Sequence, residues 1–379
     1  MMMNTIQILC LLAAGVYLVR TLVFVLGIIL ERRKQAQHIV NTSFQPFVSV
    51  VVPARNEEGN IERCVRSLMQ STYPANSFEV IIVNDRSEDR TGEILSGLQT
   101  EFPHLVVHNT EVSEGEKKSN LQGKPRAVHQ GIMRSRGEIV CMTDADCEIP
   151  PTWIRAIARM YARPEVGLVA AFTLVSGNRF FDKLQMLEWT INNTMASAGV
   201  GLKQPLGCFG NNLSVRRSVY EALGGYERIP FSVTEDLALL QAVFNAGHEV
   251  CYVCSPETGI QTMPCPDIAS FSKQHQRWVN GGKALGWRGR IFVVSSLLIW
   301  IGLVPALLQG AWLWALGLVL VRILANMLLT FHSFVTLRMA SRLWLMPFAE
   351  PFFLLIELAM PFWAMKSKVE WKGQILRNH

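Results

Sequence analysis

Apolar residues are concentrated at the two ends of the 379-residue chain, and most polar residues lie between these ends. Residues 1–30 contain one charged side chain and residues 291–321 contain none. A helix that crosses the hydrocarbon core of a bilayer needs about 20 apolar residues. The first stretch is therefore long enough for one membrane helix. The stretch 291–337 is long enough for two, with a turn expected near Pro305 and Gln309–Gly310.

A further apolar segment, 343–365, crosses the bilayer, re-enters it or lies at its surface, because prolines and two glutamates interrupt it. Basic residues at 32–34 follow the first apolar stretch, and Arg288 and Arg290 precede the second. The positive-inside rule then places the middle of the chain and the basic tail in the cytoplasm. An even number of crossings after Arg290 fits this best. We expect an integral membrane protein, in the plasma membrane if the source is bacterial. Its expected parts are a membrane helix at 1–30, a cytoplasmic domain at 46–280, an interfacial link at 281–290, two membrane helices at 291–337, the membrane segment 343–365 and a basic tail at 366–379.

The polar middle of the chain alternates short apolar runs with amphipathic stretches. Such alternation predicts strands and helices in turn, and near-continuous apolar strands are typical of a parallel sheet covered on both faces. Asn60 is a candidate N-cap for the first of these helices. We expect strands at 47–52, 78–83, 105–108 and 138–143, and helices at 61–69, 92–98 and 123–135.

Polar and acidic residues follow three of the predicted strands. Residues 54–58 come after the first strand, 84–89 after the second and 144–146 after the fourth. In open α/β sheets, the ligand crevice lies at the carboxyl ends of the strands. One acidic turn carries little information, but three at successive strand ends indicate a site.

Asp144 and Asp146 form an Asp-x-Asp triplet directly after the fourth strand. If the chain stays extended there, both carboxylates point to the same side. Two carboxylates suit a hard divalent cation, Mg²⁺ or Mn²⁺, which shares its oxygen ligands with substrate phosphates. The alternative is a solvated acidic turn, which most such triplets are. The strand-end position favours the metal site.

Two further motifs are compatible with catalysis. Glu235-Asp236 opens a predicted helix, where carboxylates either complement the helix dipole or serve as a general base. Gln274-x-x-Arg277-Trp278 combines a cation for a diphosphate with a flat apolar wall. An Arg-Trp pair near a membrane is also a common interface anchor.

Composition agrees with a membrane protein. Half of the chain is hydrophobic, 17% is charged, and the mean hydropathy is +0.22. Much of the net charge of +6 flanks the apolar segments, which suits an anionic membrane surface, and we see no basic-aromatic platform for nucleic acid. Eight cysteines in a cytoplasmic chain predict no disulfides. Cys251-x-x-Cys254 with Cys265 lacks a second matched pair, so buried thiols are a better interpretation than zinc ligands.

Taken together, these motifs resemble those of membrane-bound family-2 glycosyltransferases with the GT-A fold. The similarity covers roughly residues 46–280 and the terminal spans. This sequence departs from the family's pattern at Asn84, where the family usually has an aspartate, and at Arg86, where it often has glycine. The matching motifs, in the family's order, are Val51–Glu57, Val83–Asp89, Gly123–Ala127, Asp144–Asp146, Thr234–Asp236 and Gln274–Trp278.

The resemblance implies a role for each motif. Asp146, together with Asp144, would hold a divalent metal (Mg²⁺ or Mn²⁺) on the diphosphate. Asp236 would be the catalytic base, with Glu235 in the same motif. The loop Gly207–Asn212 resembles the acceptor side of the site. Nucleotide-sugar contacts are expected from Ala54, Asn56, Glu57, Asp85, Lys124, Asp144, Gln274, Arg277 and Trp278.

The implied function is an inverting transfer of a sugar from a nucleotide-sugar, a UDP-hexose, to the hydroxyl of a membrane-associated, lipid-like acceptor. A processive β-polysaccharide synthase of the same fold is an alternative, although the short C-terminal membrane part offers little material for a polymer channel. A non-catalytic membrane binding or transport protein is a second alternative. Transport would favour more spans and more polar intramembrane sites.

Overall fold

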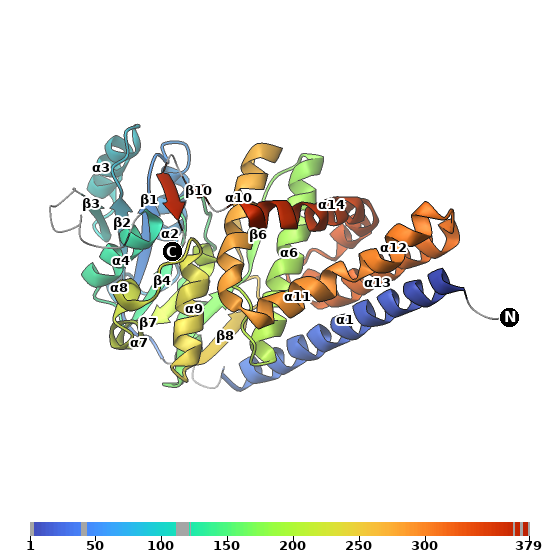
Figure 1. Cartoon of the computed structure of the whole chain (residues 1–379). Coiled ribbons are helices and arrows are strands. Elements are labelled where there is room, and N and C mark those ends of the chain that lie inside the picture. Colours follow the sequence, from blue (N-terminus) through green and yellow to red (C-terminus); the bar gives the residue numbers. More distant parts are fainter. Residues whose placement is uncertain are drawn as a thin grey trace.

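The computed structural model describes residues 4–38, 44–110, 121, 123–366, 368–371 and 374–377. An α/β domain adjoins a bundle of long apolar helices, which extends away from the sheet to the right in Figure 1. The first helix and the last long helices of the chain both belong to this bundle, as their positions in the sequence predict.

The α/β domain is built on a seven-stranded sheet with the order β3-β2-β1-β4-β7-β5-β8. Only β7 runs antiparallel to its neighbours, so the expected mostly parallel sheet is confirmed. A separate parallel pair joins β6 (Thr173–Val175) to β9 (Ile260–Thr262). The sheet strands are β1 (Val48–Ala54), β2 (Phe78–Asn84), β3 (Leu105–Asn109), β4 (Ile139–Met142), β5 (Val166–Ala171), β7 (Leu213–Arg216) and β8 (Glu249–Val253).

Helices cover both faces of the sheet. In β1, Val50 and Val52 belong to a core with α2, α3 and α5, whereas Val51 belongs to a core with α4 and α9. Both faces of the strand are buried, which explains the continuous apolar run in the sequence. The helices of this domain are α2 (Ile61–Met69), α3 (Thr91–Glu101), α4 (Lys124–Arg134), α5 (Trp153–Met160), α6 (Phe180–Gly201), α7 (Arg217–Ala222), α8 (Gly225–Arg228), α9 (Glu235–Asn245) and α10 (Ile268–Gly282).

The four predicted strands and three predicted helices are present, with bounds that differ by at most a few residues. The predicted capping role of the Asn60 side chain is wrong. Asn60 does precede α2, but its side chain makes no capping hydrogen bond. Its Nδ2 instead donates to Glu57 Oε2 at 2.9 Å, so the amide ties the preceding loop together.

The apolar ends of the chain form α1 (Thr5–His38), α11 (Trp287–Leu297), α12 (Ile299–Leu308), α13 (Trp312–Thr336) and α14 (Met346–Met365). Over the described residues, four helical segments are long and apolar enough to cross a membrane, with α11 and α12 forming one of them. The expected turn lies after Leu308, where Gly310 takes a φ of +68°. Pro305 lies inside α12 and is not part of that turn.

The C-terminal part of α1 is attached to the edge strand of the sheet. Glu31 Oε1 accepts a hydrogen bond from Tyr252 N at 2.8 Å, and Gln35 Nε2 donates to Tyr252 O at 2.6 Å. Lys34 Nζ donates to Val250 O at 2.6 Å. These side chains satisfy backbone groups that an open sheet edge leaves unpaired. The first membrane helix is therefore fixed to β8.

Both flanks of α14 contact the α/β domain. Before α14, Leu337 packs in the core that contains α4 and α9. At the end of α14, Lys283 Nζ donates to Ala364 O at 2.7 Å, and just after it Asn280 Nδ2 donates to Lys366 O at 3.0 Å. The tail then forms an antiparallel hairpin of β10 (Lys368–Trp371) and β11 (Gln374–Arg377), which the sequence had not indicated.

A buried polar network joins three of the apolar helices. Arg322 of α13 forms ion pairs with Glu350 and Glu357 of α14. Asn326 Nδ2 donates to Glu350 Oε2 at 3.1 Å, and Tyr17 of α1 donates through its hydroxyl to Asn326 Oδ1 at 3.0 Å. Charges within a membrane segment are costly unless they are paired. Here each carboxylate has a cationic partner.

Gly27 marks a close approach of α1 to α6. A Cβ at Gly27 would lie 2.9 Å from Leu202 Cγ and would overlap the Ala198 carbonyl, whereas a Cβ at Gly15 would meet no atom within 4 Å. Gly27→Ala should lower the thermal unfolding midpoint in detergent, by an amount equivalent to about 1–3 kcal/mol. Gly15→Ala, in the same helix, should keep or raise the midpoint because alanine favours helix. Equal midpoints would contradict this packing.

Candidate active site

The polar loops predicted to form a site do meet at one edge of the sheet. The parallel register pairs Ala54 at the end of β1 with Asn84 at the end of β2, and Val51 with Met142 near the end of β4. The loops that follow these strands therefore emerge side by side. Asp85, Asp144 and Asp146 all lie in them.

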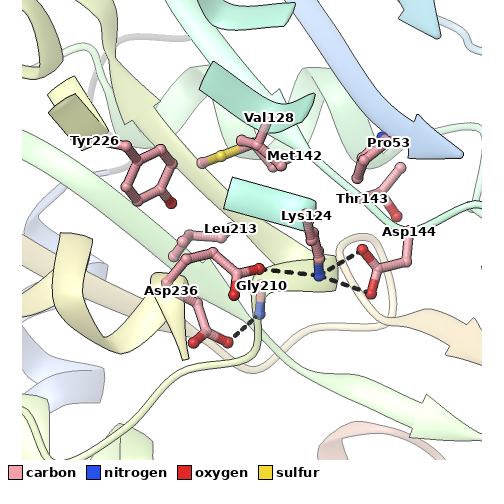
Figure 2. Close-up of a pocket in the computed structure, with 11 residues that line it drawn as sticks. Pro53, Lys124, Val128, Met142, Thr143, Asp144, Gly210, Leu213, Tyr226 and Asp236 are labelled. Atoms are coloured by element: carbon pink, nitrogen blue, oxygen red, sulfur yellow. Dashed lines mark hydrogen bonds and ion pairs between the residues drawn. The ribbon is translucent and has the colours of Figure 1, made fainter. Parts of the chain in front are cut away.

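Lys124 lies at the centre of a small pocket of about 10 Å³ (Figure 2). Its Nζ is 2.7 Å from Asp144 Oδ1 and 3.2 Å from Glu235 Oε1. Burial works to lower the pKa of Lys124, but these two carboxylates outweigh it and hold the pKa above its usual value. Lys124 therefore stays charged and joins the Asp-x-Asp loop to the start of α9.

Asp146 and Asp144 are half-buried, and contacts to the backbone fix their loop. Arg63 Nη2 donates to the Asp146 carbonyl at 3.0 Å, and the Cys64 thiol lies 3.6 Å from the Asp144 carbonyl. Burial, and then the negative charges of Asp144 and Glu57, raise the pKa of Asp146 to about 6. Asp146 therefore binds a proton more readily than a solvated aspartate.

Among the described residues, no group of three or more histidine, cysteine or acidic side chains gathers to hold a metal. Two carboxylates in one turn still fit a hard cation that takes its remaining ligands from substrate phosphates and water. Asp144 is already paired with Lys124, so Asp146 is the more available ligand. The metal-binding role of both residues stays a prediction.

Asp85 is almost fully buried at the end of β2. Its Oδ1 accepts hydrogen bonds from Arg126 Nη2 at 2.9 Å, Arg86 Nε at 3.1 Å and Thr110 Oγ1 at 2.9 Å. Burial works to raise the pKa of Asp85, but the Arg86 hydrogen bond and the Arg126 charge outweigh it, so the pKa lies below its usual value. Its Oδ2 is buried with no hydrogen-bond partner in the described part of the chain. An ionised carboxylate with one unpaired oxygen can accept a hydrogen bond from an N–H group of a nucleobase.

The loop after β1 holds the neighbouring loop in place. Asn56, with a φ of +53°, accepts a hydrogen bond at Oδ1 from Glu88 N at 2.8 Å and donates from its own N to Ser87 Oγ at 3.0 Å. The Ala54 carbonyl accepts from Asp85 N at 2.8 Å, and Glu57 acts on Asp146 through its charge. These residues lie where the sequence predicted them, and their contacts here organise the loops.

Asp236 lies at the first turn of α9, and its Oδ2 accepts a hydrogen bond from Gly210 N at 2.7 Å. Burial, and then the charge of Glu235, raise the pKa of Asp236 to about 6. Glu235 instead contacts Lys124. The two neighbouring carboxylates therefore have different partners, and the role of Asp236 as a base stays a prediction.

Asp236 also lines a second, much larger cavity of about 850 Å³. The walls of this cavity come from α6, α10 and the loop at Gly207–Phe209 on one side, and from α1, α11, α13 and α14 on the other. Most of its lining side chains are apolar, such as Phe292 and Phe353. An apolar space therefore runs from a buried carboxylate to the membrane helices.

The predicted Gln-x-x-Arg-Trp motif lies on α10 beside this cavity. Trp278 contacts Trp189 and Phe209, with ring centroids 5.3 and 5.5 Å apart, and it lines the cavity. Arg277 is close enough to lower the pKa of both Lys124 and Asp236 through its charge. Gln274 lies one turn earlier, with its Oε1 buried and without a hydrogen-bond partner among the described residues.

The structure adds residues to which the sequence assigned no role. Arg86, Arg126 and Thr110 hold Asp85. Gly210, in the loop expected on the acceptor side, holds Asp236. Arg126 stands two positions after Lys124 in the first turn of α4, so the sequence could have predicted a second cationic side chain near the site. Thr110 carries no such signal, because only the pairing of β3 with β2 brings it to the site.

A mostly parallel α/β sheet, acidic strand ends, and a carboxylate shared by a polar pocket and an apolar cavity define the class of GT-A sugar-transfer proteins associated with membranes. The chain belongs to glycosyl transferase family 21, whose model matches residues 6–379. This confirms the expected class, and it leaves the alternative of a non-catalytic membrane protein without support.

Similar proteins agree with this family. The chain is 29% identical over 268 residues to a beta-monoglucosyldiacylglycerol synthase of Trichormus variabilis, covering 68% of this chain and 53% of that protein. It is 27% identical over 294 residues to a protein with the same name from Synechocystis, covering 70% and 58%. The chain thus spans about half the length of the curated relatives it matches.

A solved structure shares the fold. The mannosyltransferase PcManGT from Pyrobaculum calidifontis, in complex with GDP-Man and Mn²⁺, superposes with a TM-score of 0.55. The sequence identity is 18%, and the match covers 90% of this chain and 99% of that one. The likeness confirms the GT-A fold.

The packing of α10 against α9 can be tested with two adjacent glycines. A Cβ at Gly281 would lie 2.7 Å from Thr234 Cβ, at the start of α9, whereas a Cβ at Gly282 would meet no atom within 4 Å. Gly281→Ala should push Trp278 and Asp236 apart and reduce sugar transfer by about 10-fold or more, equivalent to an overpacking cost of about 1–3 kcal/mol. Gly282→Ala places its methyl group on the wall of the large cavity without a clash, so it should reduce transfer less than Gly281→Ala. Similar rates for both variants would show that the contact does not position the site.

Proposed function

We propose that this protein is an inverting glycosyltransferase that moves a hexose from a UDP-hexose to the hydroxyl group of a lipid. One observation carries the proposal: Asp236 lines both the polar pocket around Lys124 and the apolar cavity that reaches the membrane helices. A base in that position would lie next to both a polar nucleotide-sugar donor and an apolar lipid acceptor.

The donor is assigned to the edge of the sheet beside Lys124, where the loops after β1, β2 and β4 emerge side by side. The free Oδ2 of Asp85 would accept a hydrogen bond from the nucleobase, and the charges of Lys124 and Arg277 would face the diphosphate. Negative charge builds on the diphosphate as the sugar leaves, so fixed cations stabilise the transition state. The relatives' names specify a glucosyl product, and the structural neighbour holds GDP-Man, which makes a hexose the expected sugar.

Asp146 and Asp144 would hold a divalent cation, Mg²⁺ or Mn²⁺, on the diphosphate. The carboxyl group of Asp146, whose pKa burial and neighbouring carboxylates raise, fits a site completed by such a cation. When bound, the cation neutralises the leaving group. The neighbouring mannosyltransferase was solved with Mn²⁺, which supports this choice of metal.

Asp236 would take the proton from the acceptor hydroxyl as that oxygen attacks the sugar. The Gly210 N–H fixes one oxygen of Asp236. A pKa of about 6 leaves Asp236 mostly ionised at neutral pH and a stronger base than a solvated aspartate. One base and one displacement invert the anomeric centre, so an α-linked donor gives a β-linked product, as the relatives' names also specify.

The acceptor is assigned to the apolar cavity. Its volume of about 850 Å³ and its apolar walls suit lipid chains, and its walls include α1, α11, α13 and α14. Polar side chains such as Arg20, Asn192 and Arg290 also lie on its wall, but most of the lining is apolar, which is why we favour a lipid over a growing polysaccharide. Diacylglycerol, the lipid in the relatives' names, is the first acceptor to test.

The α/β domain is assigned to the cytoplasm. Arg32-Arg33-Lys34 and Arg288 lie at the domain ends of α1 and α11, as the positive-inside rule requires for cytoplasmic loops. Both flanks of α14 contact this domain, which supports a re-entrant or interfacial α14 and an even number of crossings after residue 290. The N-terminus would then lie on the opposite side.

The central experiment follows transfer from labelled UDP- and GDP-hexoses to lipid extracts and diacylglycerol by mass spectrometry. The wild-type protein should form a β-linked glycolipid and release nucleoside diphosphate. Asp236→Asn should lower turnover by about 10²–10⁴-fold, because the general base is lost, while donor affinity stays the same. Turnover retained in Asp236→Asn would remove this residue as the base. No product from any donor and lipid would refute the function.

Glu235→Gln serves as the contrasting variant. It leaves Asp236 in place but removes the ion pair between residue 235 and Lys124. It should therefore raise the KM for the donor more than it lowers kcat, whereas Asp236→Asn does the reverse. The same loss of kcat in both variants would mean that the two carboxylates share one role.

The metal site is tested by removing the cation and by changing Asp146. EDTA should abolish transfer, and added Mn²⁺ should restore it. Asp146→Asn should need a higher Mn²⁺ concentration for half-maximal activity, because a ligand charge is lost. Glu148→Gln, an exposed change in the same loop, is the control and should titrate like the wild type. An unchanged titration for Asp146→Asn would exclude it as a ligand.

A further inference from the structure

Arg63, on the first turn of α2, holds the Asp-x-Asp loop from a separate element, and the proposed mechanism gives it no role. Its Nη2 donates to the Asp146 carbonyl at 3.0 Å. The loop is otherwise closed from within, by a hydrogen bond from Cys147 N to the Asp144 carbonyl at 3.1 Å. Arg63 Nε is buried, so this part of the guanidinium is shielded from water. A hydrogen bond from a charged donor is stronger in such a place than in water.

The hydrogen bond from Arg63 restricts the direction of the Asp146 side chain. The carbonyl carbon and the Cβ of Asp146 share one Cα, so a fixed peptide plane narrows the directions that the carboxylate can take. Asp146 is also the more available of the two proposed metal ligands, because Asp144 is paired with Lys124. In metal sites, the groups that hold a ligand in place affect metal affinity strongly.

Arg63 is itself held from the loop after β1. Its Nη2 lies 3.5 Å from Asn60 Oδ1, and Asn60 Nδ2 donates to Glu57 Oε2 at 2.9 Å. The amide of Asn60 therefore bridges Glu57 and Arg63 instead of capping α2. Four residues form one chain of contacts, from Glu57 through Asn60 and Arg63 to the backbone of Asp146. This chain joins the loop expected to contact the nucleotide-sugar to the loop expected to bind the metal.

We propose that Arg63 is a positioning residue for the metal site, which acts through the backbone of Asp146 and is held in place by Asn60 and Glu57. This inference rests on the proposed function, because it takes Asp146 as a ligand of the divalent cation. It also predicts the direction of the effect. The positive charge of Arg63 would by itself repel a metal ion, so its removal would tighten metal binding. Loss of its hold on Asp146 should instead weaken metal binding.

The first test measures Mn²⁺ binding to the whole chain in detergent, in the presence of UDP and, separately, of GDP. Electron paramagnetic resonance follows the loss of the signal of free Mn²⁺. Arg63→Met keeps an unbranched side chain but removes the hydrogen-bond donor. It should weaken Mn²⁺ binding by about 10- to 100-fold, the range for groups that hold a metal ligand in place. Unchanged or tighter binding would overturn the inference.

Arg66→Met, one turn further along α2, is the matched control. Arg66 pairs with Glu62 and Glu101 at the surface, and its side chain is 43% exposed. This variant should keep the wild-type Mn²⁺ affinity, and thermal unfolding reports whether each variant is folded. Equal losses of Mn²⁺ affinity in Arg66→Met and Arg63→Met would mean that any change on α2 disturbs the site, which would also overturn the inference.

Asn60→Ala tests the chain of contacts without changing either Arg63 or Asp146. It removes both hydrogen bonds of the Asn60 side chain and should weaken Mn²⁺ binding by about 2- to 10-fold. Arg63→Met combined with Asn60→Ala should bind Mn²⁺ as weakly as Arg63→Met alone, because Asn60 acts only through Arg63. Losses that multiply in the double variant, or wild-type affinity in Asn60→Ala, would refute the chain.

Failure of this inference and failure of the proposed function give different results. Mn²⁺ and a nucleoside diphosphate bind without an acceptor, so the binding test does not depend on which lipid is glycosylated. If the wild type glycosylates a lipid and Arg63→Met binds Mn²⁺ normally, only the role of Arg63 is lost. If the wild type binds no Mn²⁺ with either nucleotide, the proposed metal site and this inference are both removed. Weaker binding in Arg63→Met without transfer to any lipid would support this inference and remove the proposed reaction.

Discussion

The ammonium group of Lys124, held between Asp144 and Glu235, is the interaction on which the site depends. It joins the start of α4, the loop after β4 and the start of α9, three segments that are far apart in the sequence. Without this cation, three buried or half-buried carboxylates around it would repel one another. With it, the Asp-x-Asp loop is tied to α9, and Asp236, the residue after Glu235, is left on the wall of the large cavity.

The large cavity is lined by both the α/β domain and the apolar helices. One wall comes from α6 and α10, and the other from α1, α11, α13 and α14. The two parts are held together at several points: α1 at the edge strand β8, α10 at Lys366, and α6 at α1 near Gly27. The apolar helices therefore complete the wall of this cavity. Two buried ion pairs, from Arg322 to Glu350 and to Glu357, join α13 to α14 next to this cavity.

Local pattern and motif order predicted much of the fold. The continuous apolar strands predicted a sheet covered on both faces, and Val50, Val51 and Val52 show why, since they alternate between two cores. The positions of Asp85, Asp144 and Asp236 at strand ends or a helix start were also predictable. Asn60 precedes α2 as predicted, but its side-chain oxygen accepts no hydrogen bond from a backbone N–H in the first turn of the helix, which local sequence could not reveal. Pro305 was placed in a turn, but it lies within α12, where a membrane helix tolerates proline.

By itself, the sequence determined which segments are apolar enough for a membrane, which runs form strands, and which acidic and basic residues stand at strand ends. Each of these depends on residues close together in the chain. Only the tertiary structure decided that Glu235 pairs with Lys124 while Asp236 faces the cavity, that Arg126 and Thr110 meet at Asp85, and that Glu188 meets His275. These contacts join side chains from separate elements, and their partners are chosen by how the helices pack on the sheet.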